Sequence, residues 1–203
     1  MAAPRLLRRL LREAVDETFN RISVDGDMST NDTVFLLANG RSGVQLRPGA
    51  AGTQVFASAL QAVAQRLAHM LVADGEGASR IMEVMVAGAR NAHEAHLCAR
   101  QVASSPLVKT MLAGGDPNVG RIAAAAGASG ARCDPGRLEI RIQRQRVVAQ
   151  GRVLPLSASI VRTLLRRPFV AVRIHLHAGR AQDRMVTCDL TTEYVRINAG
   201  YAT

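Results

Sequence analysis

Strict alternation of side-chain type in two stretches constrains the fold of this chain most. Residues 138–143 alternate apolar with polar or charged side chains, and Val172, Ile174 and Leu176 alternate with Arg173, His175 and His177. A period of two is that of a β-strand with one face buried and the other polar. Both stretches are therefore predicted as strands of a sheet that has one buried face.

Apolar residues spaced three and four apart mark helices between and around these strands. The longest such pattern ends at the run Asp74-Gly75-Glu76-Gly77, which is typical of a helix stop. The predicted helices cover residues 6–19, 56–71, 90–104, 107–112, 122–128 and 157–166.

Further strands are predicted over residues 81–86 and 185–190, a buried strand or helix over 34–38, and a final strand at the start of the tail 193–203. Because helices and strands interleave, we expect an α/β (α+β) fold with mixed β-sheets layered with outer helices. A Gly- and Pro-containing stretch at 130–136 resembles a hinge. It suggests a larger α/β lobe over 1–131, with substrate-site loops, and a smaller β-rich lobe over 132–203 with a C-terminal site tail.

The charge of the chain raises the possibility of nucleic-acid binding. The formal net charge is +10, but of the 26 basic residues only Lys109 is a lysine, and aromatic residues make up 3%. The arginines are spread along the whole chain, and few rings are available to stack on bases. Nucleic acid is therefore disfavoured as the main partner, although a basic nucleic-acid-binding protein remains an alternative.

Membrane and disulfide classes are disfavoured as well. No run approaches 18 consecutive apolar residues, so no membrane span is expected. Cys98, Cys133 and Cys188 are odd in number and widely separated, which indicates a reducing cytoplasm without a disulfide framework.

No metal site is expected. His175 and His177 share one face of a predicted strand, but no third metal ligand lies in register with them. His93 and His96 are three residues apart, whereas the two histidines of a metalloprotease helix are four residues apart. The glycine-rich run 114–121 lacks the Gly-Lys-Ser/Thr ending of a phosphate-binding loop.

One carboxylate stands out as a candidate binding group. Glu76 lies between Gly75 and Gly77, where the backbone can approach closely and leave the acid projecting. An exposed carboxylate on such a loop is suited to hold an ammonium group.

Five motifs in order give the chain a specific resemblance. Together they resemble the hallmark segments of the ornithine acetyltransferase (glutamate N-acetyltransferase) family of arginine biosynthesis. The motifs are FNRISVDGD with STNDT (19–27 and 29–33), DGEGA (74–78), SPLVKT (105–110), GDPN with GR (115–118 and 120–121) and EYVRINA (193–199).

The resemblance implies an autoprocessed N-terminal-nucleophile acetyltransferase. In this family a precursor cuts itself before a threonine into an α and a β chain, and that threonine passes acetyl from N-acetylornithine to glutamate. The family implies no cofactor, although acetyl-CoA is possible as a substrate. It also implies a cytoplasmic assembly of two α and two β chains, with no nucleic acid and no membrane.

This chain is similar to the β chain only, so the fold is expected to be incomplete without the α chain. No catalytic residue is expected within it, and the nucleophilic threonine is expected upstream of Met1. The resemblance implies that Glu76 holds the α-amino end of the substrate, while Asn198 and Thr203 help to enclose it. The isolated chain is expected to be inactive, and the alternative is a truncated remnant or pseudoenzyme.

Overall fold

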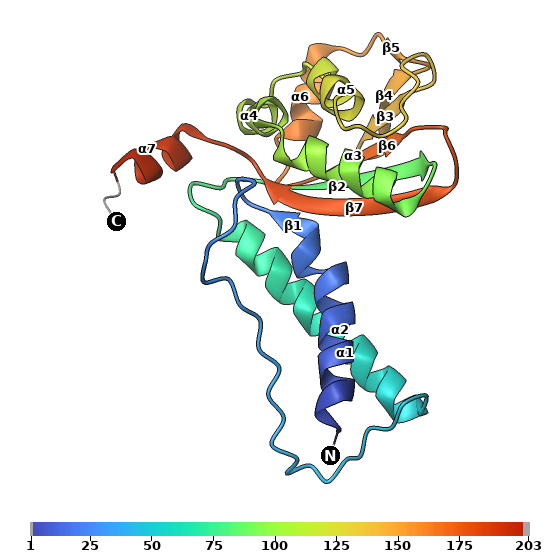
Figure 1. Cartoon of the computed structure of the whole chain (residues 1–203). Coiled ribbons are helices and arrows are strands. Elements are labelled where there is room, and N and C mark those ends of the chain that lie inside the picture. The colour runs from blue at the N-terminus through green and yellow to red at the C-terminus, as the bar shows by residue number, and fades with distance from the viewer. Residues whose placement is uncertain (1, 201–203) are drawn as a thin grey trace. The chain divides into compact units, whose positions relative to one another are not determined.

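A computed structural model describes residues 2–200 of the chain (Figure 1). It contains helices and strands in mixed order, as the interleaved sequence patterns predict. The helices are α1 (Pro4–Glu17), the 3-10 turn η1 (Phe19–Arg21), α2 (Ala51–Ala73), α3 (Ala92–Ser104), α4 (Pro106–Gly114), α5 (Gly120–Gly127), α6 (Ala158–Leu165) and α7 (Thr192–Gly200). The strands are β1 (Ile22–Ser23), β2 (Ile81–Ala89), β3 (Glu139–Ile142), β4 (Gln145–Ala149), β5 (Arg152–Val153), β6 (Phe169–His175) and β7 (Ala181–Cys188).

The strands form one mixed sheet in the order β1-β7-β2-β6-β3-β4-β5. Strand β2 runs parallel to β6 and antiparallel to β7, with Val84 opposite Val172 on one side and Met185 on the other. Val84 and Val172 are both fully buried, as the alternating pattern requires. The predicted strands 138–142 and 170–176 are confirmed as β3 and β6.

Helices cover the buried face of this sheet. Helix α3 packs on β2 and β7, and α3 also contacts α4 and α5 (Figure 1). Its inward positions Ala95, Cys98, Ala99 and Val102 follow helical spacing and are fully buried. These small side chains let the helix approach the strands closely, so the sheet core is tightly filled.

The other face of the sheet is only half-buried. Along β2 the burial alternates, so that Met82, Val84 and Val86 are buried while Glu83 and Met85 are partly exposed. Strand β6 continues this pattern. The partly exposed face therefore carries charged and polar side chains from several strands.

The chain divides into two compact units. One unit contains the residues up to Ile22 together with Asp27–Leu71, and the other contains Ser23–Gly26 and the chain from Val72 onward. This division differs from the one expected between residues 131 and 132. Strand β2, which precedes that boundary, forms hydrogen-bonded ladders with β6 and β7, which follow it, so both parts build one sheet.

The first unit contains α1 and most of α2. Leu6, Leu10 and Ala14 form the buried stripe of α1, which confirms the predicted N-terminal amphipathic helix. The buried element expected over 34–38 is wrong: this segment forms neither helix nor strand, and Phe35 is 80% exposed. Its short apolar run lies among turn-forming polar residues and pairs with no described strand.

The predicted strand at the start of the tail is also wrong, because residues 192–200 form helix α7. Polar side chains explain the difference. Arg196 pairs with Glu193 three residues earlier, and the Asn198 side chain donates to the Tyr194 carbonyl four residues earlier at 3.0 Å. These spacings join neighbours on a helix surface and would not meet along a strand.

Helix α2 qualifies the exclusion of a membrane span. With 23 residues and a mean hydropathy of 1.2 in its most apolar window, it is long and apolar enough to cross a membrane, and 17% of that window is buried. This helix meets the length and hydropathy of a span without an uninterrupted apolar run. Core helices of soluble proteins have the same length and composition, so this helix alone assigns no membrane role.

Candidate functional site

Glu76 and Asn198, which are 122 residues apart in sequence, contact each other in the second unit. The Asn198 amide Nδ2 donates to Glu76 Oε2 at 2.6 Å, and both residues are exposed. The helical form of the tail produces this contact, because α7 directs Asn198 towards the loop that carries Glu76. Thr203, the third residue predicted for the site, lies outside the described residues.

The glycines on either side of Glu76 lie where other parts of the chain approach closely. Gly77 has φ of +68°, and a Cβ added there would lie 2.6 Å from the backbone nitrogen of Tyr194 at the start of α7. A Cβ on Gly75 would lie 3.0 Å from Val24 Cγ1 and 3.3 Å from Cys188 Sγ. The absence of side chains therefore allows α7 and the end of β7 to lie against this loop.

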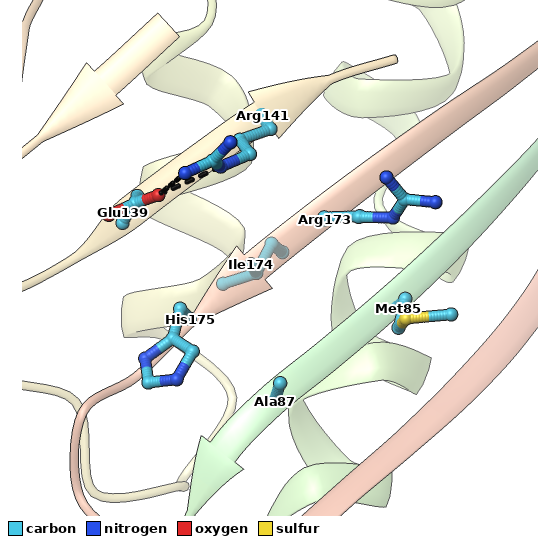
Figure 2. Close-up of a pocket in the computed structure, with 7 residues that line it drawn as sticks. All are labelled: Met85, Ala87, Glu139, Arg141, Arg173, Ile174 and His175. Carbon is cyan, nitrogen blue, oxygen red and sulfur yellow. Dashed lines mark hydrogen bonds and ion pairs between the residues drawn. The ribbon is translucent and has the colours of Figure 1, made fainter. Parts of the chain in front are cut away.

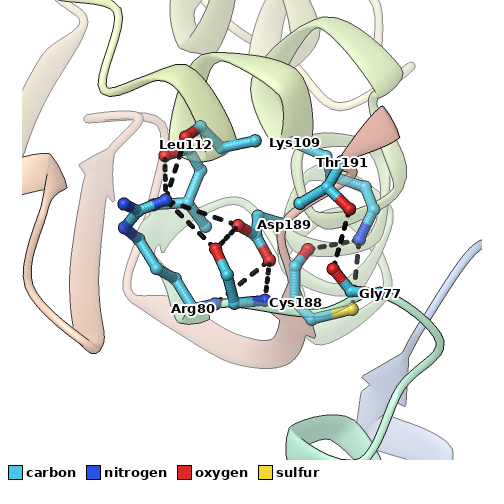
Figure 3. Close-up of polar contacts among 9 residues, drawn as sticks. Gly77, Arg80, Lys109, Leu112, Cys188, Asp189 and Thr191 are labelled. Carbon is cyan, nitrogen blue, oxygen red and sulfur yellow. Dashed lines mark hydrogen bonds and ion pairs between the residues drawn. The ribbon is translucent and has the colours of Figure 1, made fainter. Parts of the chain in front are cut away.

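A buried carboxylate holds the loop to the end of β7 (Figure 3). Asp189 is 3% exposed and accepts hydrogen bonds from the backbone nitrogens of Ser79 at 2.7 Å and Arg80 at 3.1 Å. The Ser79 hydroxyl also donates to it at 2.5 Å. The Arg80 guanidinium lies 3.5 Å from Asp189 and donates to the Ala113 carbonyl at 2.9 Å, which extends the network to the end of α4.

Two further contacts fasten the loop on the side of α7. The Thr191 hydroxyl donates to the Gly77 carbonyl at 2.7 Å, and the Asp189 backbone nitrogen donates to the Arg80 carbonyl at 3.1 Å. The chain that follows Glu76 is therefore held at Gly77 and at Ser79–Arg80 by two residues that follow β7, Thr191 and Asp189. Such support fixes the position of an exposed carboxylate before a ligand arrives.

Lys109 is a buried cation that the sequence analysis assigned no role. It is 2% exposed, and its Nζ donates to Thr187 Oγ1 at 2.8 Å and to the Cys188 carbonyl. Burial lowers the pKa of Lys109, against the opposing influence of Cys188, Asp189 and Asp25. Two sequence features could have pointed to Lys109: it is the one lysine in an arginine-rich chain, and it lies within the motif SPLVKT.

Helix α7 is also tied to the polar segment that begins at Asp25. The Tyr194 hydroxyl lies 3.0 Å from Asp25 Oδ2. One residue of the hallmark segment 19–27 thus touches the hallmark segment 193–199. Motifs from opposite ends of the chain come together around the Glu76 loop.

The glycine-rich run 114–121 has a structural role in this arrangement. Gly115 ends α4 in the left-handed conformation with φ of +62°, and Asp116 pairs with Arg121 at 3.1 Å. The run therefore makes the turn between α4 and α5. Among residues 2–200, no group of three or more His, Cys, Asp or Glu side chains is placed to hold a metal ion.

Comparisons with known proteins agree with the resemblance read from the motifs. The model of the ArgJ family matches residues 1–203. The arginine biosynthesis bifunctional protein ArgJ of Methylococcus capsulatus is 44% identical over 201 residues, which are 98% of this chain and 49% of that protein. The glutamate N-acetyltransferase of Methanopyrus kandleri is 44% identical over 205 residues, which are 100% of this chain and 53% of that protein.

A solved structure extends the agreement to the fold. A chain of the arginine biosynthesis bifunctional protein ArgJ from Bacillus halodurans superposes with a TM-score of 0.93 at 39% identity, covering 98% of this chain and 95% of that one. The mixed sheet with outer helices is therefore the N-terminal-nucleophile type of α/β fold that the motifs predicted. The chain belongs to the ArgJ family, and it spans about half the length of the curated relatives it matches.

Proposed function

We propose that this chain forms part of the substrate pocket of a glutamate N-acetyltransferase, which transfers acetyl from N-acetylornithine to glutamate in arginine biosynthesis. The observation that carries the proposal is the contact between Asn198 and Glu76 at 2.6 Å. Family membership supports the reaction, and this contact joins two of the three residues that the resemblance assigns to substrate binding.

Glu76 is suited to recognise an amino group. A carboxylate accepts several hydrogen bonds at once, and Asn198 occupies part of the capacity of one oxygen. The remaining acceptor positions, on an exposed side chain, are available to the α-amino end of a substrate. Hydrogen bonds between an ammonium group and a carboxylate are stronger than those between neutral groups.

The acetyl transfer itself requires a nucleophile outside the residues assigned here. In the proposed reaction a threonine hydroxyl attacks the acetyl carbonyl of N-acetylornithine, and ornithine leaves with its amine protonated. The amine of glutamate then attacks the resulting ester and releases the threonine. The role of this chain is to bind and orient the substrate, with an α chain as partner in a cytoplasmic assembly of two α and two β chains. Acetyl-CoA is a possible second acetyl donor, and no cofactor is needed.

Reconstitution tests this proposal. The 203-residue chain is produced alone and together with an α chain and the threonine-led segment of a close relative, and acetyl transfer from N-acetylornithine to labelled glutamate is measured. We expect no transfer by the chain alone and transfer by the reconstituted assembly. An assembly that forms but stays inactive would contradict the proposal and favour a pseudoenzyme.

A further inference from the structure

A shallow cavity opens on the half-exposed face of the sheet, within the second unit (Figure 2). Its volume is about 220 Å³, which is smaller than a typical ligand pocket and leaves room for a small charged group. Residues from β2, β3 and β6 line it: Met85, Ala87, Glu139, Arg141, Arg173, Ile174 and His175.

Two arginines on neighbouring strands line this cavity, with the Arg141 guanidinium turned towards Glu139 and that of Arg173 pointing away from it (Figure 2). Arg141 on β3 and Arg173 on β6 are register partners in an antiparallel ladder. Residues directly opposite on one face of such a ladder have Cβ atoms about 5 Å apart, and like charges there are destabilising. A pair of guanidinium groups in this arrangement therefore calls for a compensating negative charge.

The described chain neutralises only one of the pair. Glu139 lies 2.9 Å from Arg141 and 3.4 Å from Arg146, so this single carboxylate serves two arginines. On the neighbouring strand Glu83 pairs with Arg184 at 3.8 Å. Arg173 is exposed, and its side chain forms no ion pair or hydrogen bond with any residue of 2–200; Figure 2 draws dashed lines to Arg141 but none to Arg173.

A histidine is fixed at the edge of the same cavity. The His175 ring lies against Gly88, where an added Cβ would come within 2.4 Å of its Cε1 atom, and its centroid is 3.9 Å from that of His177. The bare backbone at Gly88 lets the ring lie across β2. His175 is thus a positioned hydrogen-bonding group close to the two arginines.

We propose that this cavity binds a small oxyanion, the carboxylate or phosphate group of a free metabolite, held between Arg173 and Arg141 with His175 beside it. Planar guanidinium groups match the geometry of these anions and bind them through paired hydrogen bonds. The site is distinct from the loop of Glu76, and it does not depend on the acetyl-transfer function.

Anion-dependent stability of the full chain tests the site. Thermal unfolding is followed at rising concentrations of inorganic phosphate and of citrate, with sodium chloride adjusted to hold the ionic strength constant. We expect a rise in Tm that saturates with at least one of these anions, since a ligand that binds only the folded state stabilises it. A rise that does not saturate, or no rise with either anion, would overturn the proposal.

Two substitutions and a matched control locate the effect. Arg173→Gln is expected to weaken binding of the saturating anion about tenfold. Arg173→Lys is expected to weaken it less, because lysine keeps the charge but loses the paired hydrogen bonds. Arg152→Gln, which removes an exposed arginine from β5, should leave the affinity unchanged.

A second readout covers the case of altered stability. Without anion, the Tm of the Arg173→Gln variant should be no lower than that of the unchanged chain, because the substitution removes the charge repulsion between Arg173 and Arg141. Equal anion affinity in the Arg173→Gln and Arg152→Gln variants would show adventitious binding elsewhere and would overturn the assignment.

Discussion

The Asn198 amide lies 2.6 Å from a carboxylate oxygen of Glu76, although 122 residues separate the two in sequence. This contact joins the C-terminal helix α7 to the loop before β2. Among residues 2–200, no other side-chain hydrogen bond or ion pair of the Glu76 carboxylate is present.

Substitution of Glu76 tests its role in substrate binding. In the reconstituted assembly, Glu76→Gln should raise the KM for the amino-acid substrate about 10- to 100-fold, because a hydrogen bond to a charged group is lost. Steady-state kinetics measure this change. Asp74→Asn, a neighbouring exposed carboxylate, is the control and should leave KM unchanged. Equal KM values for the two variants would count against the assignment of Glu76.

The approach of α7 to Gly77 predicts a strong effect of adding one methyl group. Gly77→Ala forces an alanine to φ of +68° and brings its Cβ to 2.6 Å from the Tyr194 nitrogen. We expect a loss of about 2 to 3 kcal/mol in the free energy of unfolding, measured by chemical denaturation.

Gly114→Ala is the matched control for that substitution. Gly114 is the last residue of α4, and an added Cβ there meets no atom within 4 Å. Alanine should therefore stabilise the chain slightly, by up to about 1 kcal/mol. If both variants lose the same stability, the close contact at Gly77 does not hold in solution.

The buried carboxylate of Asp189 is expected to be essential for stability. Asp189→Asn replaces an acceptor of three hydrogen bonds with an amide that has one acceptor oxygen. We expect the free energy of unfolding, measured by urea denaturation, to fall by about 2 to 4 kcal/mol. Asp134→Asn changes an exposed carboxylate that accepts one hydrogen bond from Gly136, and it should cost about 0.5 kcal/mol. A loss at Asp189 no larger than that at Asp134 would refute the role of this network.

The buried thiol of Cys98 predicts a loss of stability at alkaline pH. Burial raises the pKa of Cys98 from 9.0 to about 11, with a hydrogen bond to Ser129 acting in the opposite direction. Below pH 9 both the folded and the unfolded thiol are protonated, so the contribution is fully present. As the pH rises from about 9 towards about 11 the unfolded thiol ionises first, and up to about 2 to 3 kcal/mol of stability is lost.

Denaturation at several pH values measures this effect. The Cys98→Ala variant should lose less stability than the unchanged chain between about pH 9 and about pH 11. Cys133→Ala, at a half-buried thiol whose pKa burial also raises, should change the pH dependence less. Identical pH profiles for Cys98→Ala and the unchanged chain would contradict the predicted shift.

The sequence predicted the sheet well because its burial pattern is local. The alternation at Val172 and Ile174 reports directly which side chains enter the core. The failure at residues 34–38 has a different origin, since an apolar run shows only that burial would be favourable. Whether a partner is present for Phe35 and Leu37 depends on tertiary structure, and in this fold both remain exposed.

The candidate site was predicted only in part, because its contacts also depend on tertiary structure. The glycines around Glu76 are visible in the sequence, but the contact with Asn198 depends on α7 being a helix, and β-branched Val195 and Ile197 favoured a strand there. Lys109 and Asp189 were missed because a single charged residue in an apolar context carries no periodic signal. Only the fold shows that Asp189 holds Ser79 and Arg80 of this loop, while Lys109 binds Thr187 and Cys188 at the end of β7.

The position of β2 in the middle of the sheet has a consequence for how the chain folds. Its parallel neighbour β6 begins at Phe169 and its antiparallel neighbour β7 ends at Cys188, so both ladders close over about a hundred intervening residues. During synthesis the apolar residues of β2 therefore stay unpaired until the residues of β6 and β7 have been made and have left the ribosome. Nascent chains that stall before β7 are therefore expected to bind chaperones.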